Sequence, residues 1–156
     1  RRRHTRYGTV TGVQTCALPI LKLKEKIKLK AIIPSSPEQI YNAWLNSKEH
    51  SLFTGGKAKI SSRLNSKFTA WDNYISGKIL DLENNRRILH SWPTEEFPDD
   101  SEDSILEIVL KKKRKGTEII LTHTNIPAPQ AKNYKSGWKD YYFAPMKEYF
   151  KNKKIK

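Results

Sequence analysis

The fold is decided by a stretch late in the chain, residues 133–154, which reads NYKSGWKDYYFAPMKEYFKNKK. Its large apolar side chains recur at steps of four and three residues, as Trp138, Tyr142, Met146 and Tyr149. This spacing is typical of one face of a helix. A stripe this rich in aromatic rings needs a broad apolar surface to pack against. Because the preceding segments read mostly as strands, we predict a long helix lying in a curved sheet.

The composition indicates one globular domain. The 156 residues include 37% hydrophobic residues and four tryptophans, enough for one core and too few for two domains. No apolar run approaches the roughly 20 residues that a membrane span requires. The formal charge is +14, and Cys16 is the single cysteine.

The first twenty residues differ from the rest of the chain. Residues 1–20, RRRHTRYGTVTGVQTCALPI, hold four arginines, no acid and no hydrophobic period. They also lack the apolar segment of a secretory signal, so we expect a disordered or non-native leader and assign the domain to residues 21–156. Without this leader the formal charge is +10 and no cysteine remains, which excludes disulfides and thiolate metal sites. We expect a cytoplasmic protein.

Residues 21–33, LKLKEKIKLKAII, alternate strictly between lysines and apolar residues. A period of two predicts a strand with one face in water. The lysine row can be interpreted as a nucleic-acid-binding stripe. A solvated face that also discourages pairing at the sheet edge is the simpler interpretation, so nucleic-acid binding is not expected.

Two helices and a series of strands follow. Ser36 is a candidate N-cap for the first helix, and Ser47 for a second short helix that ends at Gly55 and Gly56. The predicted strands are residues 57–61, 65–71, 74–82, 87–92, 105–111 and 117–125. The last helix should begin near Gln130 and be kinked near Tyr141, because Pro145 removes one backbone hydrogen bond.

Two charged segments separate these strands. Residues 93–104 carry six acids but lack the ligand spacing of a calcium loop, so we interpret them as a solvated loop and expect no metal. The hairpin tip carries five consecutive cations, Lys111, Lys112, Lys113, Arg114 and Lys115. A solvated tip is the simpler interpretation of this run than a localisation signal.

Several motifs are similar to those of a known family. They are PEQIYNAW at 37–44, FTAWDNYISGKILDL at 68–82, ILHSW at 88–92, TEIILTHTNIP at 117–127 and GWKDYYFAPMKEYF at 137–150. Together they resemble the START-like (SRPBCC) superfamily, and within it the C-terminal domain of activators of the 90-kDa heat-shock-protein ATPase and their bacterial homologues. The resemblance implies an α+β helix-grip fold. In that fold a curved antiparallel sheet of six to seven strands wraps around the C-terminal helix, and two short helices follow the first strand.

The resemblance also implies a cavity between sheet and helix, which is either a ligand groove or filled core. The candidate lining residues are Trp44, Phe68, Trp71, Ile79, His90, Trp92, Ile108, Leu121, His123, Trp138, Tyr142 and Met146. His90 and His123 are the titratable groups that we place on the inner face. They are interpreted either as acid–base groups or as hydrogen-bonded core histidines.

We therefore predict a binding domain without catalytic residues, metal or cofactor. It would bind an apolar small ligand in the groove, an acidic chaperone-like protein partner through residues 111–115, or both. The alternative is a cyclase- or hydrolase-like enzyme that uses the groove histidines and tyrosines. No HExxH, GxSxG or phosphate-binding glycine loop supports that alternative.

Overall fold

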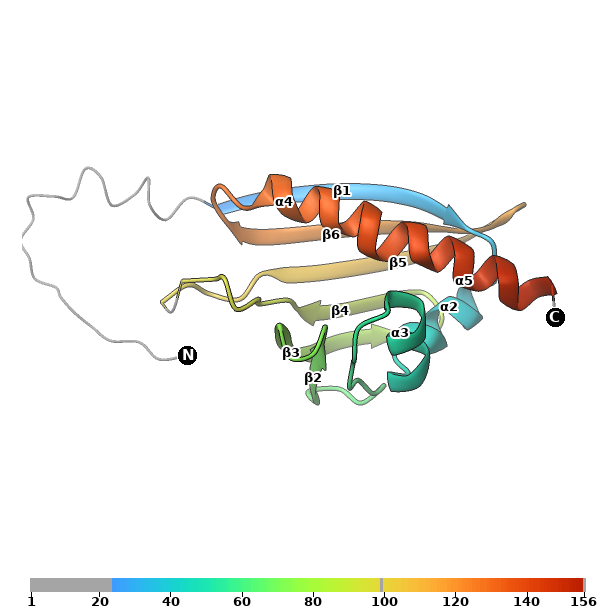
Figure 1. Ribbon diagram of the computed structural model, residues 1–156, viewed down its shortest axis with the longest axis horizontal. Helices are drawn as coiled ribbons and strands as arrows, with labels where there is room; N and C mark the ends of the chain where they lie inside the picture. Colours follow the sequence, from blue (N-terminus) through green and yellow to red (C-terminus); the bar gives the residue numbers. More distant parts are fainter. Residues whose placement is uncertain (1–23, 99, 156) are drawn as a thin grey trace, which may run out of the picture.

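A six-stranded antiparallel sheet holds a long C-terminal helix on one face in the computed structural model of the chain, which describes residues 24–98 and 100–155 (Figure 1). The predicted leader, residues 1–20, lies outside the described residues. The strands are β1 (Lys24–Ile33), β2 (Lys67–Ala70), β3 (Ile75–Glu83), β4 (Arg87–Ser91), β5 (Ile105–Lys113) and β6 (Gly116–Pro127). They pair in the order β1-β6-β5-β4-β3-β2. The predicted α+β helix-grip architecture is confirmed.

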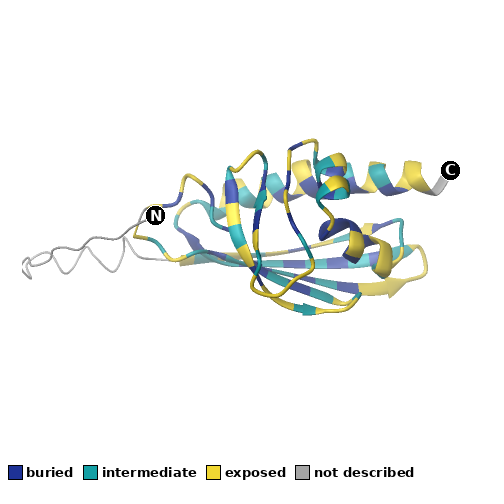
Figure 2. Ribbon diagram, turned by 90° about the horizontal axis from the view of Figure 1, so that it is seen from below, coloured by how far each residue is buried: buried dark blue, intermediate teal, exposed yellow. Residues whose placement is uncertain are grey.

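The helices form two groups. Two short ones follow β1, namely α2 (Pro37–Trp44) and α3 (Ser47–Thr54). The C-terminal helix is continuous and has three parts, namely α4 (Ala131–Trp138), η2 (Lys139–Phe143) and α5 (Ala144–Ile155). It runs along the length of the sheet, and its sheet-facing side is buried (Figures 1 and 2). No helix in the described part of the chain is both long and apolar enough to cross a membrane.

The alternation in β1 works as its pattern predicts. The four lysines of β1 are exposed, whereas Leu29 and Ile33 are buried in the core. Among the described strands β1 pairs only with β6, so the lysine row covers the outer face of an edge strand. Charged side chains in that position oppose edge-to-edge association.

The connection between α3 and β2 differs from prediction in two respects. Asn46, not Ser47, caps α3, because its side-chain oxygen accepts from the Glu49 N–H at 2.9 Å. The Ser47 hydroxyl instead accepts from the Ile60 N–H at 2.9 Å. Residues 57–61 therefore do not form the predicted strand. The hydroxyls of two α3 serines accept hydrogen bonds from backbone N–H groups of this segment. A single β-bridge joins Lys59 to Thr69.

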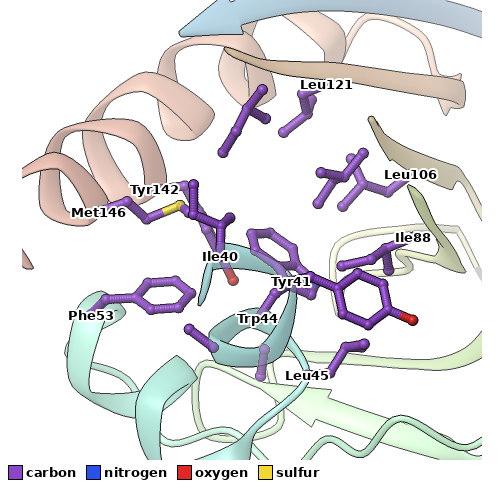
Figure 3. Close-up of a cluster of buried hydrophobic side chains, with 14 of the residues drawn as sticks. Ile40, Tyr41, Trp44, Leu45, Phe53, Ile88, Leu106, Leu121, Tyr142 and Met146 are labelled. Atoms are coloured by element: carbon purple, nitrogen blue, oxygen red, sulfur yellow. The ribbon is translucent and has the colours of Figure 1, made fainter. Parts of the chain in front are cut away.

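The C-terminal helix buries Trp138, Tyr142, Met146 and Phe150, a series with steps of four residues. Phe150 replaces the predicted Tyr149, which is half-buried. The cause is the wide π-type turn of η2, which adds about one residue to a helical turn. The residues after η2 are therefore rotated around the helix axis by about one position. Figure 3 shows Tyr142 and Met146 facing the buried side chains of α2 and the strands.

Candidate functional site

A cleft of about 480 Å³ opens between the start of the C-terminal helix and the β2–β3 end of the sheet. Three segments line it, namely the β2–β3 turn, the end of β4 with the loop after it, and α4 with η2. The lining residues are Trp71, Tyr74, Ile75, Trp92, Glu96, Gln130, Asn133, Tyr134, Gly137, Trp138, Tyr141 and Tyr142. Seven of these twelve are aromatic, so the cleft presents mainly ring surface.

The innermost part of the cleft is formed by buried rings in mutual contact. Trp92 and Trp138 lie with their ring centroids 4.9 Å apart, and Tyr142 lies 4.8 Å from Trp138. All three are at most 3% exposed. Tyr141, at 61% exposure, stands at the mouth of the cleft with its ring centroid 5.9 Å from that of Trp71. The cleft therefore has a rigid base and an accessible rim.

The β2–β3 turn holds Trp71 in an unusual conformation. Trp71, Asp72 and Asn73 have φ values of 53°, 56° and 76°, the left-handed region that costs L-residues roughly 1–2 kcal/mol each. The turn aims the indole at η2, where Nε1–H donates to the Tyr142 hydroxyl at 3.1 Å. Gly56 provides the room, because a Cβ there would lie 2.5 Å from the indole. A strained aromatic residue in a cleft is a reason to look for function there.

The opposite wall carries the second backbone irregularity. The Ala144 N–H bonds to the Lys139 carbonyl, five residues back, which defines the wide turn of η2. Pro145 has no N–H to donate, so the helix is disturbed where the sequence predicts a kink. The wide turn places both Tyr141 and Tyr142 in the cleft lining. Such turns are frequent at functional sites.

The Tyr142 hydroxyl links the cleft to a buried histidine on α3. His50 Nδ1 lies 2.8 Å from the Trp44 carbonyl and must carry its hydrogen toward it. His50 Nε2 therefore accepts from the Tyr142 hydroxyl at 3.0 Å, and that hydroxyl accepts from Trp71. Burial lowers the pKa of His50 to about 4, so the ring is neutral near pH 7.

The two predicted histidines are also fully hydrogen-bonded inside the protein. His90 accepts from the Trp44 indole at 3.1 Å and donates to the Ser91 carbonyl at 3.0 Å. Burial lowers its pKa to about 4.

His123 has the same arrangement with different partners. It accepts from the Trp138 indole at 3.1 Å and donates to the Ser104 hydroxyl at 2.7 Å, which itself donates to the Trp92 carbonyl. Burial lowers the pKa of His123 to about 3. Both predicted histidines thus fit the interpretation as hydrogen-bonded core residues.

A polar rim borders the cleft. The Tyr74 hydroxyl donates to Glu96 Oε1 at 2.6 Å. The pKa of Tyr74 is raised, mainly by burial and secondly by the hydrogen bond to this carboxylate. The Tyr134 hydroxyl donates to Gln130 Oε1 at 3.1 Å and lies 2.8 Å from the Thr94 hydroxyl. These bonds fix the orientation of the rings on the open side.

The structure brings together only some of the predicted lining residues. Four of the twelve, Trp71, Trp92, Trp138 and Tyr142, line the cleft. The other eight belong to the packed interior between sheet and helices, namely Trp44, Phe68, Ile79, His90, Ile108, Leu121, His123 and Met146.

Sequence reasoning also missed contributors to the site. Among them are His50, Tyr74, Glu96, Tyr134 and Tyr141. A signal existed for Tyr134, which lies four residues before Trp138 on the same helix face. The others depend on which segments meet in space.

The basic tip, Lys111–Lys115, lies at the opposite end of the molecule from the described part of the acidic loop, residues 93–98 and 100–104 (Figure 1). All five side chains of the tip are exposed. Four of them, from Lys112 to Lys115, border a groove of about 560 Å³ together with Lys153 and the segment before α2. A cluster of positive charge therefore marks this end of the molecule.

Comparisons with known proteins converge on one family. The family described as "Activator of Hsp90 ATPase homolog 1-like protein" matches residues 34–151. The human protein named "Activator of 90 kDa heat shock protein ATPase homolog 1" is 29% identical over 125 residues, 80% of this chain and 37% of the human one. This chain thus spans just over a third of the length of that curated relative.

Two solved structures show the same fold. An HSP90 activator from Plasmodium falciparum superposes with a TM-score of 0.73 at 18% identity and covers 80% of this chain and 95% of its own. A protein from Mesorhizobium loti gives a TM-score of 0.71 at 16% identity and covers 82% of this chain and 98% of its own.

Proposed function

This chain belongs to the Activator of Hsp90 ATPase homolog 1-like family, and from that premise we propose that it is a binding domain for an acidic partner of the 90-kDa heat-shock chaperone class. The human relative is named as an activator of that chaperone's ATPase. This chain spans 37% of the relative's length. We therefore propose partner binding for it, and not the complete activation of the ATPase.

The observation that carries the proposal is the basic tip. Five consecutive cations stand exposed on a hairpin end. Within the described part of the chain, only Lys113 of the five has an ion pair, at 3.8 Å to Glu118. A dense positive charge on a protruding hairpin attracts an acidic surface over roughly a Debye length and speeds association. Partner binding should therefore weaken as salt is added.

The test is the affinity for a purified 90-kDa heat-shock chaperone, measured by calorimetry at 50 and 300 mM NaCl. We expect the double reversal Lys112→Glu with Arg114→Glu to weaken binding at least tenfold at low salt. The matched control is Lys26→Glu with Lys28→Glu, which makes the same charge change on the outer face of β1. Equal losses in both variants, or an affinity independent of salt, would contradict binding through the tip.

A second candidate function is ligand binding in the cleft. Its support is the open volume of about 480 Å³ lined by seven aromatic rings. Pockets of this size and composition are typical small-molecule sites.

The enzyme alternative has less support from the geometry. Both ring nitrogens of His50, His90 and His123 are engaged in internal hydrogen bonds, and none of the three lines the cleft. A histidine that acts as a general base must reach the substrate with a free ring nitrogen.

A further inference from the structure

We propose that the cleft binds a small organic cation, with a quaternary or methylated ammonium group seated among its aromatic rings. This inference deepens the second candidate function and rests on it. It names the ligand class of the cleft and leaves the protein-binding role of the basic tip unaffected.

The rings supply the attraction. Cations bind over aromatic faces, most strongly over indole, and methylated ammonium groups suit such sites because they are weakly hydrated. The cleft is lined by Trp71, Trp92 and Trp138, together with four tyrosines. In the described part of the chain, the one contact between a cation and a ring joins Lys153 to Tyr149, and neither residue lines the cleft. No described lysine or arginine therefore occupies the cleft rings.

The hydrogen-bond donors of the cleft are mostly committed to the protein. The Tyr74, Tyr134 and Tyr142 hydroxyls donate to Glu96, Gln130 and His50. The Trp71 and Trp138 indoles donate to Tyr142 and His123. A ligand therefore meets ring faces and acceptor oxygens more than free N–H or O–H groups. Such a surface disfavours an anion and favours a cation.

The local charge has the matching sign. Among the described residues that line the cleft, Glu96 is the only charged one. Its Oε1 accepts from Tyr74, and its Oε2 has no hydrogen-bond partner among the described residues. The same loop continues with further acids, Glu102 and Asp103 among them, in a chain whose formal charge is +14. The lysines of α4, Lys132 and Lys135, are exposed and do not line the cleft.

The size of the cleft adds a constraint on the ligand. A trimethylammonium group fills only part of about 480 Å³. The remaining volume, whose lining includes the buried Ile75 and the exposed Tyr141, suits an apolar portion of the same molecule. The geometry thus points to a cationic amphiphile or a cationic aromatic compound.

The test uses two probes that differ in one atom. Choline carries the trimethylammonium group, and 3,3-dimethylbutan-1-ol has carbon in place of the charged nitrogen. Tryptophan fluorescence of the full chain is followed in titrations at constant ionic strength. We expect choline to bind at least fivefold more tightly than the alcohol, within the roughly 2- to 30-fold that cation–aromatic contacts provide.

Two variants and a control connect this preference to the cleft. Glu96→Gln keeps an acceptor for Tyr74 and removes the charge, so it should weaken choline binding about threefold or more and leave alcohol binding unchanged. Tyr141→Ala removes an exposed ring of the rim and should weaken choline binding in a folded protein. Glu148→Gln, on the exposed side of α5, should change neither affinity.

Equal affinities for the two probes, unchanged in Glu96→Gln, would overturn the cation proposal and leave an apolar ligand site. No binding of either probe up to 50 mM would overturn both cleft assignments. Neither result bears on the salt-dependent partner binding, which is measured separately with the chaperone.

Discussion

Mild acid should destabilise this protein through its three buried histidines. Each ring is held neutral by one donor and one acceptor, and no charged side chain hydrogen-bonds to any of them among the described residues. Protonation would turn the accepting ring nitrogen into a donor. That nitrogen would then face the donor that it now accepts from, which is Tyr142 for His50, Trp44 for His90 and Trp138 for His123. The folded state must therefore exclude a proton that the unfolded chain accepts.

The direction follows from the pKa values. The folded pKa is about 4 for His50 and His90 and about 3 for His123, below the value near 6.5 of an exposed histidine. As the pH falls below 6.5 the unfolded chain takes up protons first, so stability decreases until the folded pKa values are reached. Between pH 7.5 and 5.5 each histidine should cost about 1.3 kcal/mol, and the three together about 4 kcal/mol.

Such a loss is large against a typical unfolding free energy of about 5–15 kcal/mol. The assay is urea unfolding at pH 7.5, 6.5 and 5.5, followed by tryptophan fluorescence. His50→Gln is the matched variant, because an amide can donate to the Trp44 carbonyl and accept from Tyr142 without titrating. It should remove about a third of the pH dependence. The carboxylate of Glu49, whose pKa is lowered, loses its contribution only below about pH 4.5 and lies outside this range.

An unfolding free energy that changes by less than about 1 kcal/mol between pH 7.5 and 5.5 would refute this reasoning. It would mean that the rings are protonated in the folded state or are not buried as described. An unchanged slope in His50→Gln would exclude that ring in particular.

Three further predictions concern the walls of the cleft and the α3 cap. Trp138→Phe should destabilise the fold by about 1–3 kcal/mol in urea unfolding, because His123 Nδ1 loses its donor inside the core. Gly56→Ala should cost about 1–3 kcal/mol in thermal unfolding and shift the fluorescence of Trp71, since the new methyl group overlaps the indole. Asn46→Ala should cost about 0.5–2 kcal/mol in urea unfolding through loss of the α3 cap.

Each of these predictions has a control in the same region. Tyr141→Phe changes an exposed ring and should be neutral where Trp138→Phe is not. Gly137→Ala adds a methyl group with no neighbour closer than 3.9 Å, in contrast to Gly56→Ala. Lys48→Ala alters α3 beside its cap without touching it. A control as destabilising as its paired variant would contradict the stated cause.

The strands and the C-terminal helix could be predicted because their signals are local. In β1, a lysine at every second position settles which face meets water, and the register with β6 then follows from burial of Leu29 and Ile33. The cap of α3 is a different case. Asn46 and Ser47 are both good capping residues. The choice depends on Ile60, thirteen residues after Ser47, because the Ile60 N–H donates to the serine hydroxyl.

A cavity between sheet and helix could be expected, but its position and most of its lining could not, because they depend on two local departures from regular backbone geometry. The helical pattern alone places the face at Trp138, Tyr142, Met146 and Tyr149 and implies one uniform packing surface. The wide turn before Pro145 changes that phase, so Phe150 becomes buried and Tyr141 stands beside Tyr142 at the cleft.

The left-handed turn is equally hidden in the sequence. An Asp-Asn pair predicts a turn, but not that the preceding Trp71 adopts a positive φ and spans the space to Tyr142. The two departures meet at one hydrogen bond, between the Trp71 indole and the Tyr142 hydroxyl, which joins the two walls of the cleft. Each departure is local in the chain, but their meeting depends on the fold that brings residues 71 and 142 together.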